Sequence, residues 1–83
     1  MKKRIQDYID NHAKFMAKGY AEAYQMLNDE DYETAYKRGY DLAVVKISHD
    51  FATKKYMNRE LTKEQIIECF PALSMSDIED ICM

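Results

Sequence analysis

Lys-Gly-Tyr-Ala-Glu-Ala at residues 18–23 and Arg-Gly-Tyr-Asp-Leu-Ala at residues 38–43 share one pattern, a basic residue followed by Gly-Tyr-x-x-Ala. These segments hold the only two glycines of the chain. A glycine inside a helix costs about 1 kcal/mol relative to alanine, so two glycines at matching places need a structural reason. Gly-x-x-x-Ala sets two small residues on one helix face, which lets a second backbone come close. The repeat therefore predicts two helices that cross closely.

Apolar residues recur at helical spacing over two long stretches, residues 5–27 and residues 32–51. Asn-Asp-Glu-Asp at residues 28–31 interrupts the pattern and supplies acids that favour the start of a helix. An antiparallel pairing about this turn places Gly19 opposite Gly39, because each lies ten residues from Asp29. The predicted helix-crossing notch consists of Gly19, Ala23, Ala35, Gly39 and Ala43.

The chain after residue 58 repeats one helix-start pattern twice. Thr62 can cap a helix while Gln65 reaches back to it, and Ser74 and Asp77 repeat the arrangement twelve residues later. Pro71 lies between the two segments and ends the first of them. The pattern predicts two short capped helices, at residues 62–70 and 74–82.

These elements predict an all-α fold in a single domain over residues 1–83. A long antiparallel hairpin over residues 1–58 precedes a short helix pair over residues 61–83. A chain of 83 residues can bury only a small core, and proteins of this size often depend on a partner for stability. Two glycines and one proline leave little material for the turns of a β fold.

The second long stretch is apolar almost all round at residues 42–45, and a helix with two apolar faces must bury both. This predicts a homodimer with two-fold symmetry, unless the short C-terminal helices cover the second face. The tyrosines beside the notch either cover it within one hairpin or meet a partner. The candidate interface consists of Tyr20, Tyr24, Tyr36, Tyr40, Val44 and Val45.

Charge is unevenly placed along the chain. Residues 1–59 hold 11 Lys/Arg against 9 Asp/Glu, whereas residues 60–83 hold one Lys against six acids. The acidic end favours basic partners over phosphate. Basic residues at 2–4 and 54–59 lie at helix ends that an antiparallel hairpin makes neighbours, so they could form a basic partner site or only add solubility.

Nothing in the sequence predicts catalysis. His12 and His49 have no Cys or acid at metal-ligand spacing, and no glycine-rich or oxyanion element accompanies Cys69. We therefore expect neither an enzyme nor a metal or cofactor site. Cys69 and Cys82 lack the spacing of a disulfide framework, and no apolar run is long enough to cross a membrane. These features predict reduced thiols in a cytoplasmic protein.

Residues 61–78 read Leu-Thr-Lys-Glu-Gln-Ile-Ile-Glu-Cys-Phe-Pro-Ala-Leu-Ser-Met-Ser-Asp-Ile. This segment resembles the helix-turn-helix of small VapB-like antitoxins and, less closely, the helical tail of the recombination-promoting nucleases called Rpn. The resemblance covers about 22 of the 83 residues and includes neither the Gly-, Pro- and Thr-rich upstream part of the antitoxins nor the nuclease domain. It implies a tight helix pair centred on Phe70, Pro71, Leu73 and Ile78.

The sequence thus favours a non-catalytic module that binds and inhibits or regulates another protein. The module is antitoxin-like, nuclease-tail-like, or comparable to small phage inhibitors of bacterial defence. The alternative is a DNA-binding transcriptional regulator that uses the C-terminal helix pair. Its recognition helix would carry Asp77, Glu79 and Asp80 and no basic residue, whereas DNA-reading helices present basic and amide groups. Nucleic acid is therefore the less expected partner.

Overall fold

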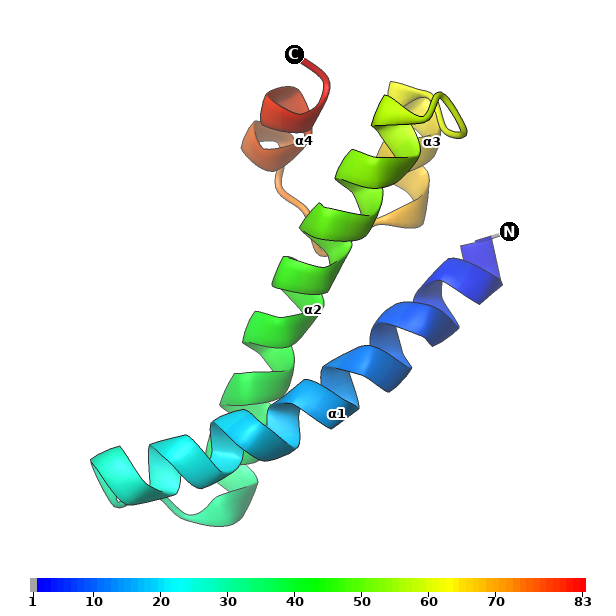
Figure 1. The fold of residues 1–83 in the computed structure, drawn as a ribbon. Coiled ribbons are helices and arrows are strands. Elements are labelled where there is room, and N and C mark those ends of the chain that lie inside the picture. The colour runs from blue at the N-terminus through cyan, green and yellow to red at the C-terminus, as the bar shows by residue number, and fades with distance from the viewer. Residues whose placement is uncertain (1) are drawn as a thin grey trace.

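The computed structural model describes residues 2–83, which form four helices and no strand. Figure 1 shows two long antiparallel helices that cross near the closed end of a hairpin and diverge toward the end where both termini lie. Two short helices lie beside the second long helix at this open end. The all-α hairpin followed by a short helix pair is confirmed, with the bounds α1 Lys2–Asn28, α2 Tyr32–Met57, α3 Lys63–Cys69 and α4 Met75–Ile81.

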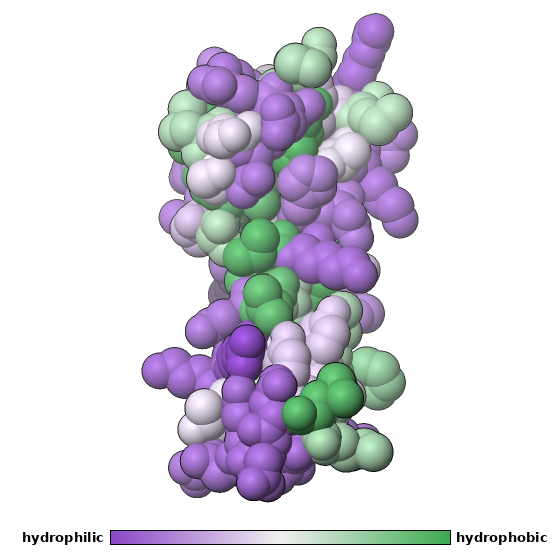
Figure 2. Space-filling model, turned by 90° about the vertical axis from the view of Figure 1, so that its left-hand side faces the viewer, coloured by the Kyte–Doolittle hydropathy of each residue, from purple (hydrophilic) through white to green (hydrophobic). Residues whose placement is uncertain are grey.

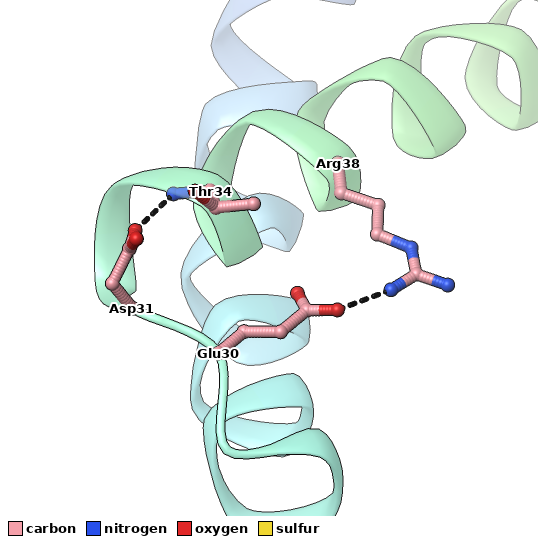
Figure 3. A network of polar contacts seen from close by, with 4 residues as sticks. All are labelled: Glu30, Asp31, Thr34 and Arg38. Carbon is pink, nitrogen blue, oxygen red and sulfur yellow. Dashed lines mark hydrogen bonds and ion pairs between the residues drawn. The ribbon is translucent and has the colours of Figure 1, made fainter.

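Acidic residues build the turn between α1 and α2 (Figure 3). Asp29 follows α1 with a φ of 54°, a left-handed conformation that Asp tolerates better than most residues. The Asp31 carboxylate caps α2 by accepting a hydrogen bond of 2.8 Å from the backbone N–H of Thr34. Glu30 pairs with Arg38 in the second turn of α2. The expected helix start at this segment is therefore present.

The closed half of the hairpin packs through small side chains. Residues buried in α1 recur at intervals of four, and the α2 residues that meet them recur at the same interval. This spacing lines one face of each helix and allows a close crossing. In the closed half the buried residues are Ala13, Ala17 and Ala21 in α1, and Ala35, Gly39 and Ala43 in α2.

The α1 side of this contact differs from the expected notch. Gly19 and Ala23 are exposed, and nothing lies within 4 Å of a Cβ built on Gly19. A Cβ built on Gly39 would instead lie 2.5 Å from the Cβ of Tyr20. The prediction that Gly19 faces Gly39 is therefore wrong. Gly19 lies about 200° around the helix from the buried Ala17, so it points away from α2.

The largest apolar side chains gather at the open end, where α3 and α4 fold onto the hairpin. Phe70 is completely buried and its ring lies 5.7 Å from that of Phe51. The side chain of Gln6 donates a hydrogen bond to the backbone oxygen of Cys69, which ties α1 to the end of α3. The core cluster comprises Ile5, Ile9, Ala52, Leu61, Ile66, Cys69, Phe70, Leu73 and Ile78.

Both short helices begin with the capping boxes that the sequence predicts. The backbone N–H of Thr62 donates to Gln65 at 2.9 Å, and the backbone N–H of Gln65 donates to the Thr62 hydroxyl at 3.3 Å. Ser74 and Asp77 exchange the corresponding bonds at 3.2 Å each. A helix of seven residues is marginal by itself, so these caps and the buried Ile78 hold α4 in place.

Candidate functional site

A cleft lies between the diverging ends of α1 and α2, with a volume of about 620 Å³. We call it the open-end cleft. A second depression adjoins it and shares four of its residues, and it extends the surface toward Lys54 and Asn58. The open-end cleft is lined by Arg4, Ile5, Tyr8, Phe51, Lys55, Glu60 and Leu61.

Aromatic and aliphatic side chains form the floor of the open-end cleft. The ring centroids of Tyr8 and Phe51 lie 4.8 Å apart in an edge-to-face arrangement, which aromatic pairs favour. Tyr8 also contacts His12, with centroids 4.2 Å apart. Ile5 and Leu61 belong to the core cluster, so the floor continues directly into the interior. Such a floor can accept an apolar side chain from a ligand.

Cations surround this apolar floor. The Lys55 ammonium lies 5.5 Å from the centre of the Phe51 ring and 3.2 Å from a carboxylate oxygen of Glu60. Arg4 and Lys54 are exposed, and neither forms an ion pair within residues 2–83. The two basic helix ends are thus brought to one cleft, and Glu60 neutralises only one of their charges.

Helix dipoles act on the cations of the two helix ends in opposite ways. Lys54 and Lys55 lie in the last turn of α2, where the partial negative charge of the helix end stabilises them. Lys2, Lys3 and Arg4 lie in the first turn of α1, which contains no acid, so their charges add to the positive end of the helix. An anion at this end of the hairpin would be favoured by the cationic side chains and by the start of α1, and disfavoured by the end of α2.

A partly buried hydrogen bond holds one tyrosine of the candidate interface in place. The Tyr40 hydroxyl donates to the carboxylate of Asp10, which is also 3.0 Å from the Lys14 ammonium. Because the bond requires a protonated phenol, it raises the pKa of Tyr40 to about 12, and burial adds to the shift. The same bond, followed by Lys14, lowers the pKa of Asp10. Tyr40 therefore makes an intramolecular contact between α1 and α2.

The other predicted interface residues are divided between the hairpin and its surface. Tyr20 and Tyr24 are half-buried and stack with centroids 6.2 Å apart, and the Arg38 guanidinium lies 4.7 Å from the centre of the Tyr24 ring. Tyr36 is half-buried beside Tyr32, with centroids 6.0 Å apart. The rings thus pair within each helix, Tyr20 with Tyr24 in α1 and Tyr32 with Tyr36 in α2.

The second apolar face of α2 is covered only in part. Val44 and Ile47 pack against the core cluster that α3 and α4 complete, whereas Leu42 is 51% exposed and Val45 is 43% exposed. Figure 2, which views the molecule from the left-hand side of Figure 1, shows apolar side chains gathered along its middle. The short C-terminal helices thus bury one part of this face and leave another part open.

Within residues 2–83, no group of three or more His, Cys, Asp or Glu side chains is placed to hold a metal ion. Cys69 is buried in the core and Cys82 is half-buried, and both are free thiols. His12 is exposed beside Tyr8, and His49 is half-buried in α2.

Sequence reasoning anticipated the cations of the open-end cleft but missed its aromatic floor. Tyr8 lies 21 residues before Asp29 and Phe51 lies 22 residues after it, so the hairpin register already places the two rings at one level. Counting residues from Asp29, as was done for the two glycines, would have predicted that Tyr8 and Phe51 lie close together. The divergence of α1 from α2, which opens the cleft, has no comparable signal in the sequence.

Comparison of the chain with protein-family models, with curated proteins and with solved structures finds no match. None of the helices over residues 2–83 combines the length and the apolar character that a membrane crossing needs.

Proposed function

We propose that the protein is a non-catalytic binding module that captures an acidic segment of a partner protein in the open-end cleft. The observation that carries this proposal is the apolar floor of Tyr8 and Phe51, bordered by the unpaired cation Arg4 and, in the adjoining depression, by the unpaired cation Lys54. An aromatic or leucine side chain of the segment would enter the cleft, and flanking carboxylates would meet the cations. By occupying that segment the module would inhibit or regulate its partner.

The mixed character of the cleft supports a peptide ligand. Protein interfaces combine a desolvated apolar centre, which supplies most of the affinity, with a polar rim that steers the encounter. The open-end cleft has the same layout, with an apolar floor at its centre and charged groups at its rim. The resemblance of residues 61–78 to antitoxin and nuclease-tail segments also favours a regulator of another protein over an independent activity.

The competing hypothesis, a DNA-binding regulator, draws less support from α3 and α4. α4 has only seven residues, and its exposed side chains include Glu79 and Asp80. Phosphate contacts supply most of the affinity of DNA-binding proteins, and acids repel phosphate. The basic cleft lies at the hairpin ends rather than on the short helix pair.

Selection from a display library of short random peptides tests the proposal. We expect enrichment of peptides that carry several acids around one aromatic or leucine residue. The affinity of an enriched peptide is then measured by fluorescence anisotropy for the wild type and for the double variant Arg4→Glu/Lys54→Glu. Reversal of both rim charges should weaken binding by at least about tenfold.

The matched control is Lys37→Glu/Lys46→Glu, which reverses two exposed cations of α2 that do not line the cleft. It changes the net charge by the same amount and should alter the affinity by less than about threefold. Equal losses in both variants would show that binding follows net charge and not the cleft. Tight binding of duplex DNA, weakening steeply with salt, would favour the competing hypothesis.

A further inference from the structure

α1 carries a second line of apolar and small residues on the side turned away from α2. Phe15, Gly19 and Ala23 recur at intervals of four, and Met26 follows one turn later. Phe15 is 79% exposed and Met26 is 87% exposed, while the position beside Gly19 is open. We call these four residues the outer α1 face. Large apolar side chains grouped around an open backbone are typical of a surface that another protein covers.

We propose that a second copy of this chain covers the outer α1 face, with the two α1 helices antiparallel about a two-fold axis at Gly19. Residue n of one copy then lies level with residue 38 − n of the other. The two glycines meet at the axis, where the absence of side chains lets the backbones come close. The contact is self-complementary and closes as a dimer.

Side chains of opposite size face each other in this register. Phe15 of one copy lies level with Ala23 of the second copy, so the ring extends over a small residue. Met26 lies level with His12 of the second copy, and a thioether packs well against an aromatic ring. From residue 12 to residue 26 the contact is about 21 Å long. The large exposed side chains of the outer α1 face are thus covered without a clash at its centre.

Charged residues along one edge of the outer α1 face fit the same register. Lys18 and Glu22 are exposed, and neither forms an ion pair within residues 2–83. The two-fold axis brings like edges together and sets Lys18 two residues, about 3 Å along the axis, from the level of Glu22 of the second copy. Two symmetric ion pairs then border the contact. A parallel two-fold pairing would instead bring opposite edges together and would separate Lys18 from Glu22 of the second copy.

The ends of the contact are complementary as well. The acidic turn at residues 29–31 of one copy lies level with residues 7–9 of the second copy. Lys2, Lys3 and Arg4 begin one helical turn beyond this level and are exposed. Asp7 is exposed at the level of the turn and repels its acids, whereas the three cations one turn further along outnumber Asp7 and attract them. Three separate features of α1 select the same antiparallel arrangement.

This inference is independent of the proposed binding function. Residues of the outer α1 face do not line the open-end cleft, so Gly19→Leu leaves the cleft in place. Arg4 is shared, because it lines the cleft and also lies near the end of the contact. A chain that dimerises without binding acidic peptides, or binds them as a monomer, would separate the two proposals.

Sedimentation of the wild type between about 1 µM and 500 µM is the first test, and we expect reversible dimerisation within this range. Gly19→Leu adds a side chain at the axis, where the single chain has open space, so the variant should keep its helix content. We expect it to remain monomeric throughout the range. A monomeric wild type, or a variant that dimerises as well as the wild type, would overturn the proposal.

Charge reversal tests the register. Lys18→Glu and Glu22→Lys each place like charges together at both ion pairs, and each should raise the dimer dissociation constant by at least about tenfold. The double variant restores opposite charges and should return to within about threefold of the wild type. Because both residues are exposed, these substitutions should leave the fold of the single chain unchanged. A double variant as weak as the single ones would overturn the antiparallel register.

Discussion

Gly39 of α2 lies against the Cβ of Tyr20 of α1, and this contact limits how closely the two long helices cross. A Cβ on Gly39 would lie 2.5 Å from that atom and 3.4 Å from the backbone oxygen of Ala17. Both atoms are fixed by the α1 backbone, so neither can swing aside. The alanines on either side of Gly39 are buried in the same contact and depend on the same separation.

Gly39→Ala should therefore destabilise the hairpin despite its better helix propensity. The gain in propensity is at most about 1 kcal/mol, whereas overpacking typically costs about 1–3 kcal/mol. We expect the free energy of unfolding to fall by about 1–2 kcal/mol and the Tm to fall by roughly 4–16 °C. Urea and thermal unfolding followed by circular dichroism would measure both quantities.

Gly19→Ala is the matched control in the other half of the repeat. Nothing lies within 4 Å of the added methyl group, so only the propensity gain remains. We expect the free energy of unfolding to rise by up to about 1 kcal/mol at low concentration, where the chain is monomeric. Shifts of the same sign at both glycines would contradict the close crossing at Gly39.

The two glycines also show how far the sequence could predict this fold. The hairpin, its turn and both capping boxes follow from local signals: periodicity, acids at a helix start, and paired Thr/Gln and Ser/Asp residues. These local signals do not predict which face of α1 packs against α2. α1 carries two lines of small residues, one through Ala17 and one through Gly19, and spacing alone cannot choose between them. The choice depends on how the whole surface of α1 meets α2 and the short helices.

Prediction of the candidate site had a similar limit. Register arithmetic predicts that Arg4 and Lys54 lie near each other, because it counts residues from the turn. A cleft between them requires that α1 diverge from α2, and the crossing angle depends on the bulk of side chains at both ends. Small residues pack at the closed end and the larger core side chains, Phe70 among them, at the open end, so the crossing depends on residues far apart in the sequence.

Tyr40→Phe should remove stability only within a window of pH. The raised pKa of Tyr40 gives stability that is fully present below about pH 10, its value in the unfolded chain, and is lost as pH rises through about 12. The lowered pKa of Asp10 gives stability that is present above about pH 3.8 and is lost as pH falls further. We expect the variant to be less stable than the wild type between these limits.

Urea unfolding at several pH values would measure this difference, which should shrink toward zero at both extremes. Tyr36→Phe is the control, because Tyr36 is half-buried in the same helix and makes no side-chain hydrogen bond within residues 2–83. Its effect should be small and independent of pH. A difference for Tyr40→Phe that persists unchanged at acidic and alkaline pH would assign the loss to packing and not to the bond with Asp10.

Ser74→Ala should release α4 more readily than the rest of the fold. The substitution removes the hydroxyl that accepts from the backbone N–H of Asp77, and such caps contribute about 1 kcal/mol. We expect faster hydrogen exchange in α4, measured by mass spectrometry, with smaller changes in α1. Ser76→Ala alters an exposed serine two residues along the same helix and should leave exchange unchanged. Equal effects of the two substitutions would mean that the capping box does not hold α4.

Phe70→Ala should be the most destabilising of these substitutions. Phe70 is completely buried and its ring contacts Phe51 at the point where α3 meets the hairpin. Truncation of a buried phenylalanine costs about 3–5 kcal/mol, which approaches the total stability of many domains. Loss of the ring would also withdraw support from the floor of the open-end cleft. We therefore expect a broad unfolding transition or none, together with binding of a hydrophobic dye.

Phe15→Ala provides the control for Phe70→Ala, because it removes the same group from a side chain that is 79% exposed. Its effect on the free energy of unfolding of the monomer should stay within about 0.5 kcal/mol. Both variants are measured at low micromolar concentration so that self-association does not contribute. A cooperative transition for Phe70→Ala close to that of the wild type would mean that α3 and its following turn do not complete the core.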